Sequence, residues 1–180
     1  MDRQTVITFL EQYNETSEEQ HSKRHIISFI KNNENCFERS LQKGHITASA
    51  WLLNKDLSKA LLMHHRKLDM WVQLGGHCDG DSNVLRVALK EAQEESGINH
   101  IKPLSENIFD LDVHLIPANP KEPAHYHYDI RFLLHAYHSD TVIQNNESKE
   151  LRWFSYLEPF PTNERSVLRM AEKWQSFRIE

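Results

Sequence analysis

The chain has 180 residues, of which 39% are hydrophobic and 26% are charged, and its formal net charge at pH 7 is −5. This apolar content suffices for the core of one globular domain and excludes a globally disordered chain. A negative net charge argues against a protein that binds nucleic-acid phosphates, so we expect no specific nucleic-acid partner.

No stretch of the sequence has the length and apolarity of a membrane span, because apolar runs such as Lys59–Met63 extend over only a few residues. The N-terminal residues lack a basic segment followed by a long apolar one, so no signal peptide is expected. Cys36 and Cys78 have neither the number nor the spacing of a disulfide framework or a zinc site. We therefore expect a cytoplasmic protein that does not act at a membrane.

The N-terminal region predicts a small helical extension. Val6, Leu10 and Tyr13 recur at helical spacing, and a second apolar stripe follows after a polar break. We assign residues 1–40 to this extension and residues 41–180 to the main domain. The sequence leaves three roles open for the extension: packing on the main domain, lining the substrate entrance, or forming a dimer contact. The chain is accordingly expected to be a monomer or a homodimer.

From residue 45 onward the pattern is mainly that of strands, separated by turn formers such as Asn54–Asp56 and the Gly75–Gly76 pair. One helix is expected from about Asn83 to Ser96, ended by Gly97, and another from Pro161–Thr162 onward. A helix between strands indicates an α+β fold with a mixed sheet. The predicted strands are His45–Leu53, Ser58–His65, Met70–Leu74, Asp110–Pro117, His125–Tyr137 and Leu151–Ser155.

Three carboxylates gather on one face of the central predicted helix. At about 100° per residue, Glu91, Glu94 and Glu95 fall within an arc of about 100°. Such like charges repel each other on a helix, whereas a hard divalent cation such as Mg²⁺ would bind their oxygens. Lys90 can pair with Glu94. A solvated acidic face is the alternative, and the flanking glycines favour a site. The predicted buried stripe of the same helix is Val84, Leu85, Ala88 and Ala92.

Residues 76–98 resemble the Nudix box, Gly-x5-Glu-x7-Arg-Glu-apolar-x-Glu-Glu-x-Gly-apolar. Two positions depart from this pattern: Ser82 stands in place of the first glutamate, and Lys90 stands in place of the arginine. Asp81 and Asp79 are the candidates to replace the missing glutamate. Lysine keeps the charge of arginine but loses its bidentate geometry. The matching residues are Gly76, Glu91, Ala92, Glu94, Glu95, Gly97 and Ile98.

The resemblance implies a Nudix-type α/β/α sandwich and a metal-dependent hydrolase. It would cleave a diphosphate linkage in a nucleoside diphosphate derivative or a related small molecule, with Mg²⁺ or Mn²⁺ as cofactor. Water would attack phosphorus while the metal neutralises charge on the phosphate oxygens. The resemblance makes Glu91 and Glu95 the principal metal ligands and Glu94 a further ligand or part of the water-activating group. The backbone carbonyl of Gly76, or of its neighbour Gly75, would complete the set.

Further site residues are expected outside the three carboxylates. In this family the general base sometimes lies in a later loop, and Glu147 and Glu150 are the candidates because they precede a predicted strand. Two candidates for binding the substrate are Trp71 and Arg66, which belongs to the basic cluster 64–67 before the Gly75–Gly76 pair, the glycine loop. His77 is another candidate, and it lies in the loop between Gly76 and the predicted helix, which we call the box loop.

His125 and His127 alternate along a predicted strand, so they share a face, and Asp129 continues it. We predict that both histidines bind substrate together with His77. A second metal site and a buried structural role are the other interpretations of this pattern.

Two other functions remain compatible with the sequence. A Nudix-fold module that binds a ligand or regulates without hydrolysis is one, although the complete carboxylate set favours hydrolysis. The other is an isoprenoid diphosphate isomerase, which is suggested by Cys78 in the box loop.

Overall fold

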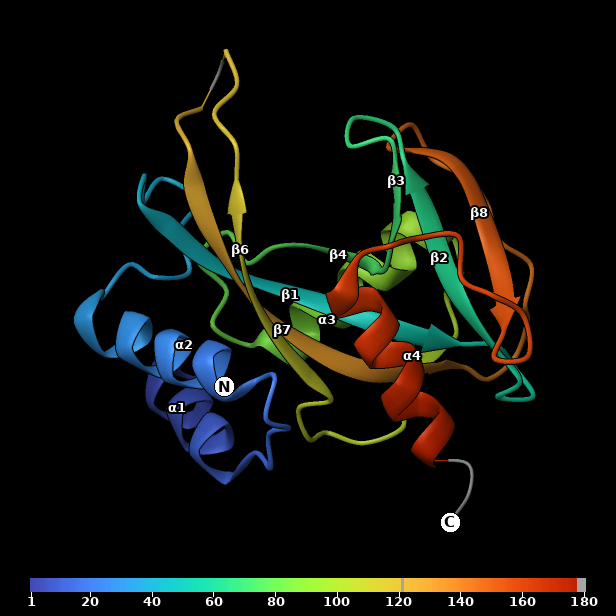
Figure 1. The fold of residues 1–180 in the computed structure, drawn as a ribbon, viewed down its shortest axis with the longest axis horizontal. Coiled ribbons are helices and arrows are strands. Elements are labelled where there is room, and N and C mark those ends of the chain that lie inside the picture. Colours follow the sequence, from blue (N-terminus) through green and yellow to red (C-terminus); the bar gives the residue numbers. More distant parts are fainter. Residues whose placement is uncertain (121, 178–180) are drawn as a thin grey trace. The chain divides into compact units, whose positions relative to one another are not determined.

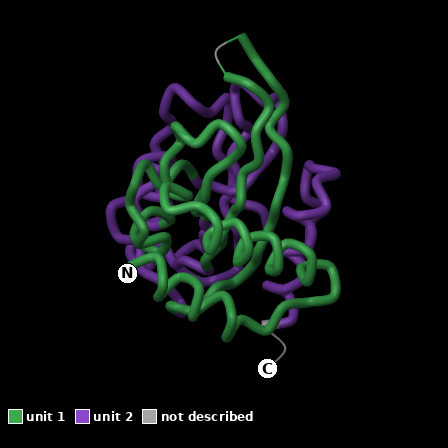
Figure 2. Tube along the Cα trace, turned by 90° about the vertical axis from the view of Figure 1, so that its left-hand side faces the viewer, with its two compact units in different colours: residues 1–49, 76–88, 106–132 green, residues 50–75, 89–105, 133–180 purple. Residues whose placement is uncertain are grey.

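The computed structural model describes residues 1–120 and 122–177 and divides into two compact units (Figure 2). Unit 1 comprises residues 1–49, 76–88 and 106–132, and unit 2 comprises residues 50–75, 89–105 and 133 onward. The helices are α1 (Arg3–Gln12), α2 (Gln20–Asn32), α3 (Val84–Ser96) and α4 (Arg165–Phe177). The strands are β1 (Gly44–Leu53), β2 (Lys59–His65), β3 (Met70–Val72), β4 (Leu74–His77), β5 (Ile101–Pro103), β6 (Asp110–Ile116), β7 (His125–Ala136) and β8 (Ser148–Ser155) (Figure 1).

The strands belong to one hydrogen-bonded sheet. Its order is β3-β2-β1-β7-β5, and β4, β6 and β8 pair with β1, β7 and β2, respectively. Helices and strands alternate irregularly along the chain rather than as regular strand–helix repeats. The α+β fold class predicted from the sequence is therefore confirmed.

In unit 1 the two N-terminal helices pack together, and α2 packs on β6 (Figure 1). Ile26 and Ile30 on the apolar face of α2 are fully buried. Glu19, just before α2, is also fully buried and accepts hydrogen bonds from the Tyr13 hydroxyl and the Leu111 backbone N–H. A buried carboxylate stays stable only when hydrogen-bonded in this way. The N-terminal helices are thus attached to β6 by apolar and polar contacts together.

A buried arginine organises the β6–β7 pair of unit 1. The two strands are antiparallel, and Arg131 on β7 lies opposite Asp110 on β6. The Arg131 guanidinium is 2.7 Å from Asp129, 3.1 Å from Asp110 and 3.2 Å from Asp112. Arg131 is 1% exposed, so three carboxylates balance one fully buried cation.

In unit 2 the strand β2 pairs antiparallel with both β3 and β8. The helix α4 buries Val167, Ala171 and Trp174, which recur at helical spacing. The rings of Trp174 and Trp51 have centroids 6.3 Å apart, and both side chains are fully buried. Aromatic contact between α4 and β1 therefore forms part of the core of this unit.

Several boundaries differ from the sequence prediction. The Gly75–Gly76 pair lies inside β4 instead of ending a strand. Backbone hydrogen bonds to β1 define this strand, and its glycines carry no side chains that would show an alternating pattern in the sequence. The helix α4 begins at Arg165 rather than at Pro161–Thr162, because the Glu164 carbonyl accepts its first backbone hydrogen bonds. Strand β8 begins at Ser148, three residues earlier than predicted.

Two further features were not predicted. Strand β5 is only three residues long and ends in a proline, so no alternation marks it. On α3, Val87 is buried, whereas Leu85 is only partly buried. Val84, Ala88 and Ala92 of the predicted stripe are buried as expected.

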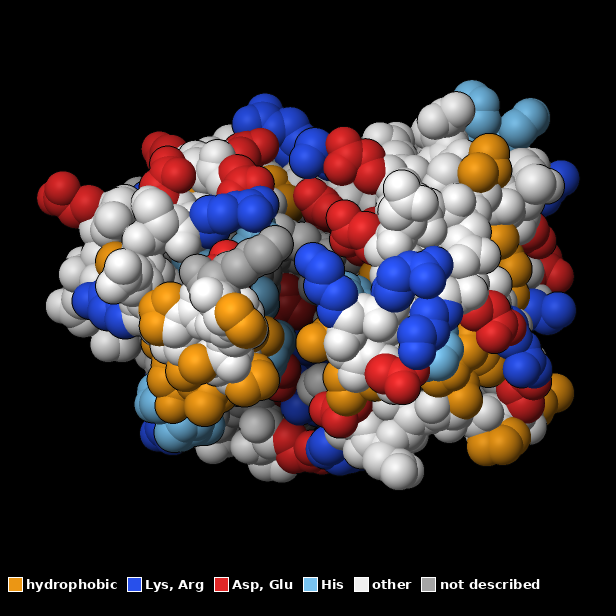
Figure 3. Space-filling model, turned by 90° about the horizontal axis from the view of Figure 1, so that it is seen from above, with side chains coloured by type: hydrophobic (Ala, Val, Ile, Leu, Met, Phe, Trp, Pro, Cys, Tyr) orange, Lys and Arg blue, Asp and Glu red, His pale blue; other side chains and the backbone are white. Residues whose placement is uncertain are grey.

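The surface carries charges of both signs. On the face seen in Figure 3, acidic and basic side chains are interspersed rather than gathered in one basic field. Among the described residues, no helix combines the length and apolar composition needed to cross a membrane.

We expect Arg131→Met to lower the free energy of unfolding by about 3–5 kcal/mol, because it leaves buried carboxylates without their cation. Urea denaturation measures this change. Arg24→Met, on the exposed side of α2, is the matched control and should change stability by less than about 0.5 kcal/mol. Equal effects of the two substitutions would contradict the assigned role of Arg131.

Candidate active site

The three carboxylates predicted to share a helix face lie in the part of α3 that belongs to unit 2. Gly97 ends the helix with a φ of 71°, a conformation that glycine adopts without strain. A Cβ at this position would lie 2.6 Å from Cβ of Ile143, so the next segment approaches the helix end closely. The Ile143 backbone N–H donates to the Ser96 carbonyl at 2.7 Å. The last turn of α3 is therefore fixed by both its glycine and this segment.

Glu95 is the most buried of the three carboxylates. It is 4% exposed, and its Oε2 accepts a hydrogen bond of 2.8 Å from the Gly75 backbone N–H. Burial raises its pKa to about 8; the Gly75 hydrogen bond opposes this rise, and the nearby Glu91, Glu147 and Glu94 add to it. A carboxyl group with so high a pKa in acidic surroundings is typical of functional sites.

Glu91 and Glu94 complete the acidic face. Burial raises the pKa of Glu91. The positive charge of Lys90 opposes this rise, whereas the negative charges of Glu94 and Glu147 add to it. Lys90 Nζ lies 3.3 Å from Glu91 and 3.4 Å from Glu94, which confirms the predicted pairing with Glu94. Glu94 is exposed, whereas Glu91 is only 16% exposed in its side chain. One lysine on the surface thus faces two carboxylates, and the buried Glu95 interacts with a backbone N–H.

The loop before β8 brings one of the two candidate bases to this helix. Asn145 donates to the Glu94 carbonyl at 3.5 Å and accepts from the Glu147 backbone N–H at 2.9 Å. The Glu147 carboxylate is near enough to raise the pKa of both Glu91 and Glu95. Glu150 instead lies on β8 opposite His64 of β2. Glu147 therefore belongs to the acidic group.

Arg66 holds this loop from the other side. Its backbone N–H donates to the Glu147 carbonyl, and its guanidinium donates to the carbonyls of Asn146 and Ser148 at 3.0 and 2.9 Å. Arg66 thus positions the loop that carries Glu147. Trp71, the other substrate-binding candidate of unit 2, stacks on His64 with ring centroids 5.2 Å apart and is partly buried.

The box loop in unit 1 is held by ion pairs. Asp81 accepts two hydrogen bonds of 2.8 Å from the Arg86 guanidinium, and Asp79 pairs with Arg39. Ser82, at the position of the missing glutamate, donates to the Met1 carbonyl. The candidate replacements Asp81 and Asp79 therefore each bind an arginine in this structure.

The predicted histidines lie in unit 1, where they form part of a larger histidine cluster. His77 ends β4, His127 lies on β7, and His45 at the start of β1 joins them. The ring of His45 lies 4.9 Å from that of His77 and 4.9 Å from that of His127, measured between centroids. Burial and, to a smaller extent, the neighbouring imidazoles lower the pKa of His45 to about 4 and that of His127 to about 2.

Two more histidines border this cluster, and the sequence pattern predicted a site role only for His125. His125 donates from Nδ1 to the Pro123 carbonyl at 2.8 Å. His114 lies directly opposite His127 in the β6–β7 ladder and pairs with Asp112. Both His45 and His114 were missed, because strand pairing rather than sequence spacing brings them to the cluster. Asp129, two residues after His127 on β7, accepts hydrogen bonds from the hydroxyl groups of Thr47 and Ser49 and from Arg131.

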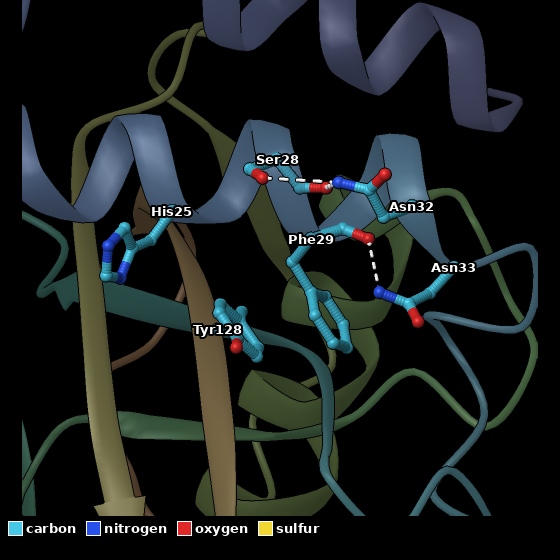
Figure 4. A pocket seen from close by; sticks show the side chains of 6 residues that line it. All are labelled: His25, Ser28, Phe29, Asn32, Asn33 and Tyr128. Carbon is cyan, nitrogen blue, oxygen red and sulfur yellow. Dashed lines mark hydrogen bonds between the residues drawn. The ribbon is translucent and has the colours of Figure 1, made fainter.

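A shallow hollow of about 240 Å³ lies between α2 and β7 in unit 1 (Figure 4). Its base is formed by Phe29 and Tyr128, whose rings stack with centroids 4.0 Å apart. The amides of Asn32 and Asn33 bond to carbonyls of their own helix. The remaining lining residues, His25 and Ser28, add no carboxylate, and none of the predicted site residues lies there.

A family model described as the NUDIX domain matches residues 43–174. The chain belongs to the NUDIX family. This match covers the glycine loop, α3 and the loop of Glu147, so the chain is a Nudix-type hydrolase of diphosphate compounds. A comparison with curated proteins gives no significant match.

Solved Nudix structures share the fold of this chain. An Ap4A hydrolase from C. elegans has a TM-score of 0.60 at 16% identity and covers 74% of this chain and 97% of its own. A NUDIX-family hydrolase from Clostridium perfringens has a TM-score of 0.55 at 21% identity, with the same coverages of 74% and 97%. A UDP-X diphosphatase has a TM-score of 0.54 at 12% identity and covers 98% of this chain and 93% of its own. These likenesses confirm the predicted Nudix fold.

We expect the metal-free Nudix chain to lose stability as the pH rises from about 5 to about 8, because the folded state binds the Glu95 proton more tightly than the unfolded state does. Glu95→Gln removes this titration. In the presence of a chelator, its melting temperature should equal that of the wild type near pH 5 and exceed it by several degrees near pH 8.5. Thermal melts across this pH range measure the difference.

Glu106→Gln, an exposed substitution, is the control and should follow the wild type at every pH. A difference between Glu95→Gln and wild type that does not depend on pH would contradict the raised pKa of Glu95.

Proposed function

We propose that this chain hydrolyses the diphosphate linkage of a nucleoside diphosphate derivative, using Mg²⁺ or Mn²⁺ bound at Glu91, Glu94 and Glu95. The observation that carries this proposal is the burial of Glu95 beside two further carboxylates, with its orientation set by the Gly75 backbone N–H. Repulsion within this group is costly without a cation, so a structural role alone does not account for it.

The donor set fits a hard divalent ion. Carboxylate oxygens are the ligands that Mg²⁺ prefers, and it binds few of them because it retains water and substrate phosphate oxygens. Lys90 offsets only part of the negative charge of Glu91 and Glu94. The Gly76 carbonyl is the further ligand that the family resemblance suggests. When bound, such an ion neutralises charge on phosphate oxygens and activates water.

The protein groups supply orientation and proton transfer. The Gly75 N–H directs one oxygen of Glu95, so that its other oxygen has a defined direction. Glu147 is the better candidate for the general base, because its carboxylate interacts with Glu91 and Glu95 while Glu150 lies in the β2–β8 ladder. Arg66 acts as a positioning residue, since it bonds to the backbone on both sides of Glu147.

Substrate recognition in unit 2 is proposed for Trp71. Its ring is partly buried, stacks on His64 and meets Phe154 edge to face, so its orientation is fixed. A fixed aromatic ring suits stacking on a nucleobase. Two of the structural relatives are an Ap4A hydrolase and a UDP-X diphosphatase, so nucleotide compounds are the substrates to test first. The isomerase alternative rested on Cys78 as a reactive thiol. It loses this support, because Cys78 is buried and burial raises the pKa of its thiol.

We expect a panel of dinucleoside polyphosphates, nucleotide sugars and other nucleoside diphosphate derivatives, assayed with Mg²⁺ or Mn²⁺, to yield at least one substrate. With that substrate, Glu95→Gln should lower kcat by at least a hundredfold, because it removes a charge from the metal-binding face. Kinetics on a correctly folded variant, checked by circular dichroism, measure this loss.

Glu106→Gln serves again as the exposed control and should retain wild-type kcat. A loss below about tenfold for Glu95→Gln, roughly 1.4 kcal/mol of barrier, would mean that the carboxylate face is not the active site.

The choice of general base is tested separately. Glu147→Gln should lower kcat at least tenfold, because the group that accepts the proton is lost. Glu150→Gln, three residues further on, is the matched comparison and should keep the wild-type kcat. The reverse result would assign the base to Glu150.

A further inference from the structure

The histidine cluster of unit 1 contains buried ring nitrogens that form no hydrogen bond of normal geometry with the described part of the chain. Nε2 of His127 and both ring nitrogens of His45 are buried and form no hydrogen bond of normal geometry with the described residues, although the Leu41 backbone lies near the His45 ring. His45 is only 3% exposed. A buried polar atom left in this way costs about 1–3 kcal/mol, and native structures rarely retain several at one place without a ligand.

These nitrogens converge on a common centre. One ligand atom from each of His45, His77 and His127 lies within 4.8 Å of the other two. Zinc–nitrogen bonds of about 2.0–2.1 Å place tetrahedral ligands about 3.3 Å apart. Small side-chain rotations therefore suffice to bring the three imidazoles into coordination.

We propose that His45, His77 and His127 form a binding site for a divalent transition-metal ion of the kind that prefers imidazole, with Zn²⁺ as its representative. Imidazole nitrogens suit Zn²⁺, Co²⁺ and Ni²⁺, whereas the carboxylates of α3 suit Mg²⁺. The site is thus chemically distinct from the proposed catalytic one and does not depend on it. All three histidines belong to unit 1.

A fourth ligand is available in the same cluster. The ring of His125 lies 5.1 Å from that of His45 and 5.2 Å from that of His127, measured between centroids. Its Nδ1 donates to a backbone carbonyl, so its Nε2 carries a lone pair. Metal-binding histidines typically have their second nitrogen oriented in this way. Either His125 or a water molecule completes a tetrahedral set.

The site would join three chain segments that are distant in sequence. His45 begins β1, His77 follows Gly76 at the end of β4, and His127 lies on β7. The neighbouring Asp129 is already bonded to Ser49 and Arg131, which leaves imidazoles as the donors. A bound ion would therefore brace the box loop against two strands of its own unit, which is a structural role.

The chain offers a matched control for adventitious metal binding. His21 and His25 are exposed on α2, four residues apart, and their rings are 3.8 Å apart between centroids. Such a pair on a helix surface can chelate metal weakly. The double variant His21→Ala/His25→Ala removes it without touching the buried cluster.

The test is a titration of the full chain, stripped of metal by a chelator, with Zn²⁺ in competition with a chromophoric chelator. We expect one equivalent to bind with submicromolar affinity, Co²⁺ to give the intense visible absorption of a tetrahedral site, and Zn²⁺ to raise the melting temperature by several degrees. His127→Gln and His77→Gln should each weaken binding at least a hundredfold. His21→Ala/His25→Ala and Glu95→Gln should bind Zn²⁺ as the wild type does.

Three outcomes would overturn the proposal: no stoichiometric binding by the wild type, loss of binding only in His21→Ala/His25→Ala, or loss in Glu95→Gln with retention in the cluster variants. His77 is only partly buried, so His77→Gln decides the matter if His127→Gln does not fold. Failure of Mg²⁺-dependent hydrolysis is measured separately and leaves this result unaffected.

Discussion

The hydrogen bond from the Gly75 backbone N–H to the buried Glu95 carboxylate is the contact on which the proposed chemistry depends. This hydrogen bond links β4 to α3, the helix that carries Glu91 and Glu94, and it fixes the direction of one oxygen of Glu95. A single N–H cannot offset the burial of a carboxylate near three others, as the raised pKa of Glu95 shows. In the proposed function, a cation bound at this helix face offsets the cost of ionising Glu95.

The surrounding contacts of unit 2 maintain this arrangement. Gly97 allows the chain to leave α3 beside Ile143, and the following segment places Asn145 on the Glu94 carbonyl. Arg66 then holds the carbonyls next to Glu147. Because these bonds involve the backbone, the position of Glu147 depends on the path of the loop rather than on its own side-chain contacts. The general-base role proposed for Glu147 requires rigid support of this kind.

Local periodicity made one part of the site predictable. The 3.6-residue repeat placed Glu91, Glu94 and Glu95 on one face and identified Gly97 as the helix end, and both features depend only on nearby residues. The ion pairs Arg39–Asp79 and Arg131–Asp110 connect residues 40 and 21 positions apart, which no local pattern reveals.

Strand pairing explains what the sequence did not show. His45 and His114 reach the histidine cluster through their strands, and His114 faces His127 only because of the β6–β7 register. Glu147 and Glu150 looked equivalent in sequence, and the early start of β8 separated them by putting Glu150 into a ladder. The short β5 and the glycine-containing β4 lacked side-chain alternation, so they were missed or misplaced.

The most direct measurement of the central claim is an anomalous-scattering map from crystals of the full chain grown with Mn²⁺, which replaces Mg²⁺ at oxygen-rich sites. The carboxylate face predicts a strong peak within coordination distance of oxygens of Glu91 and Glu95 that disappears in crystals of Glu95→Gln. An occupied Mn²⁺ position elsewhere in the chain, with no peak at these carboxylates, would contradict the assignment of the catalytic metal to α3.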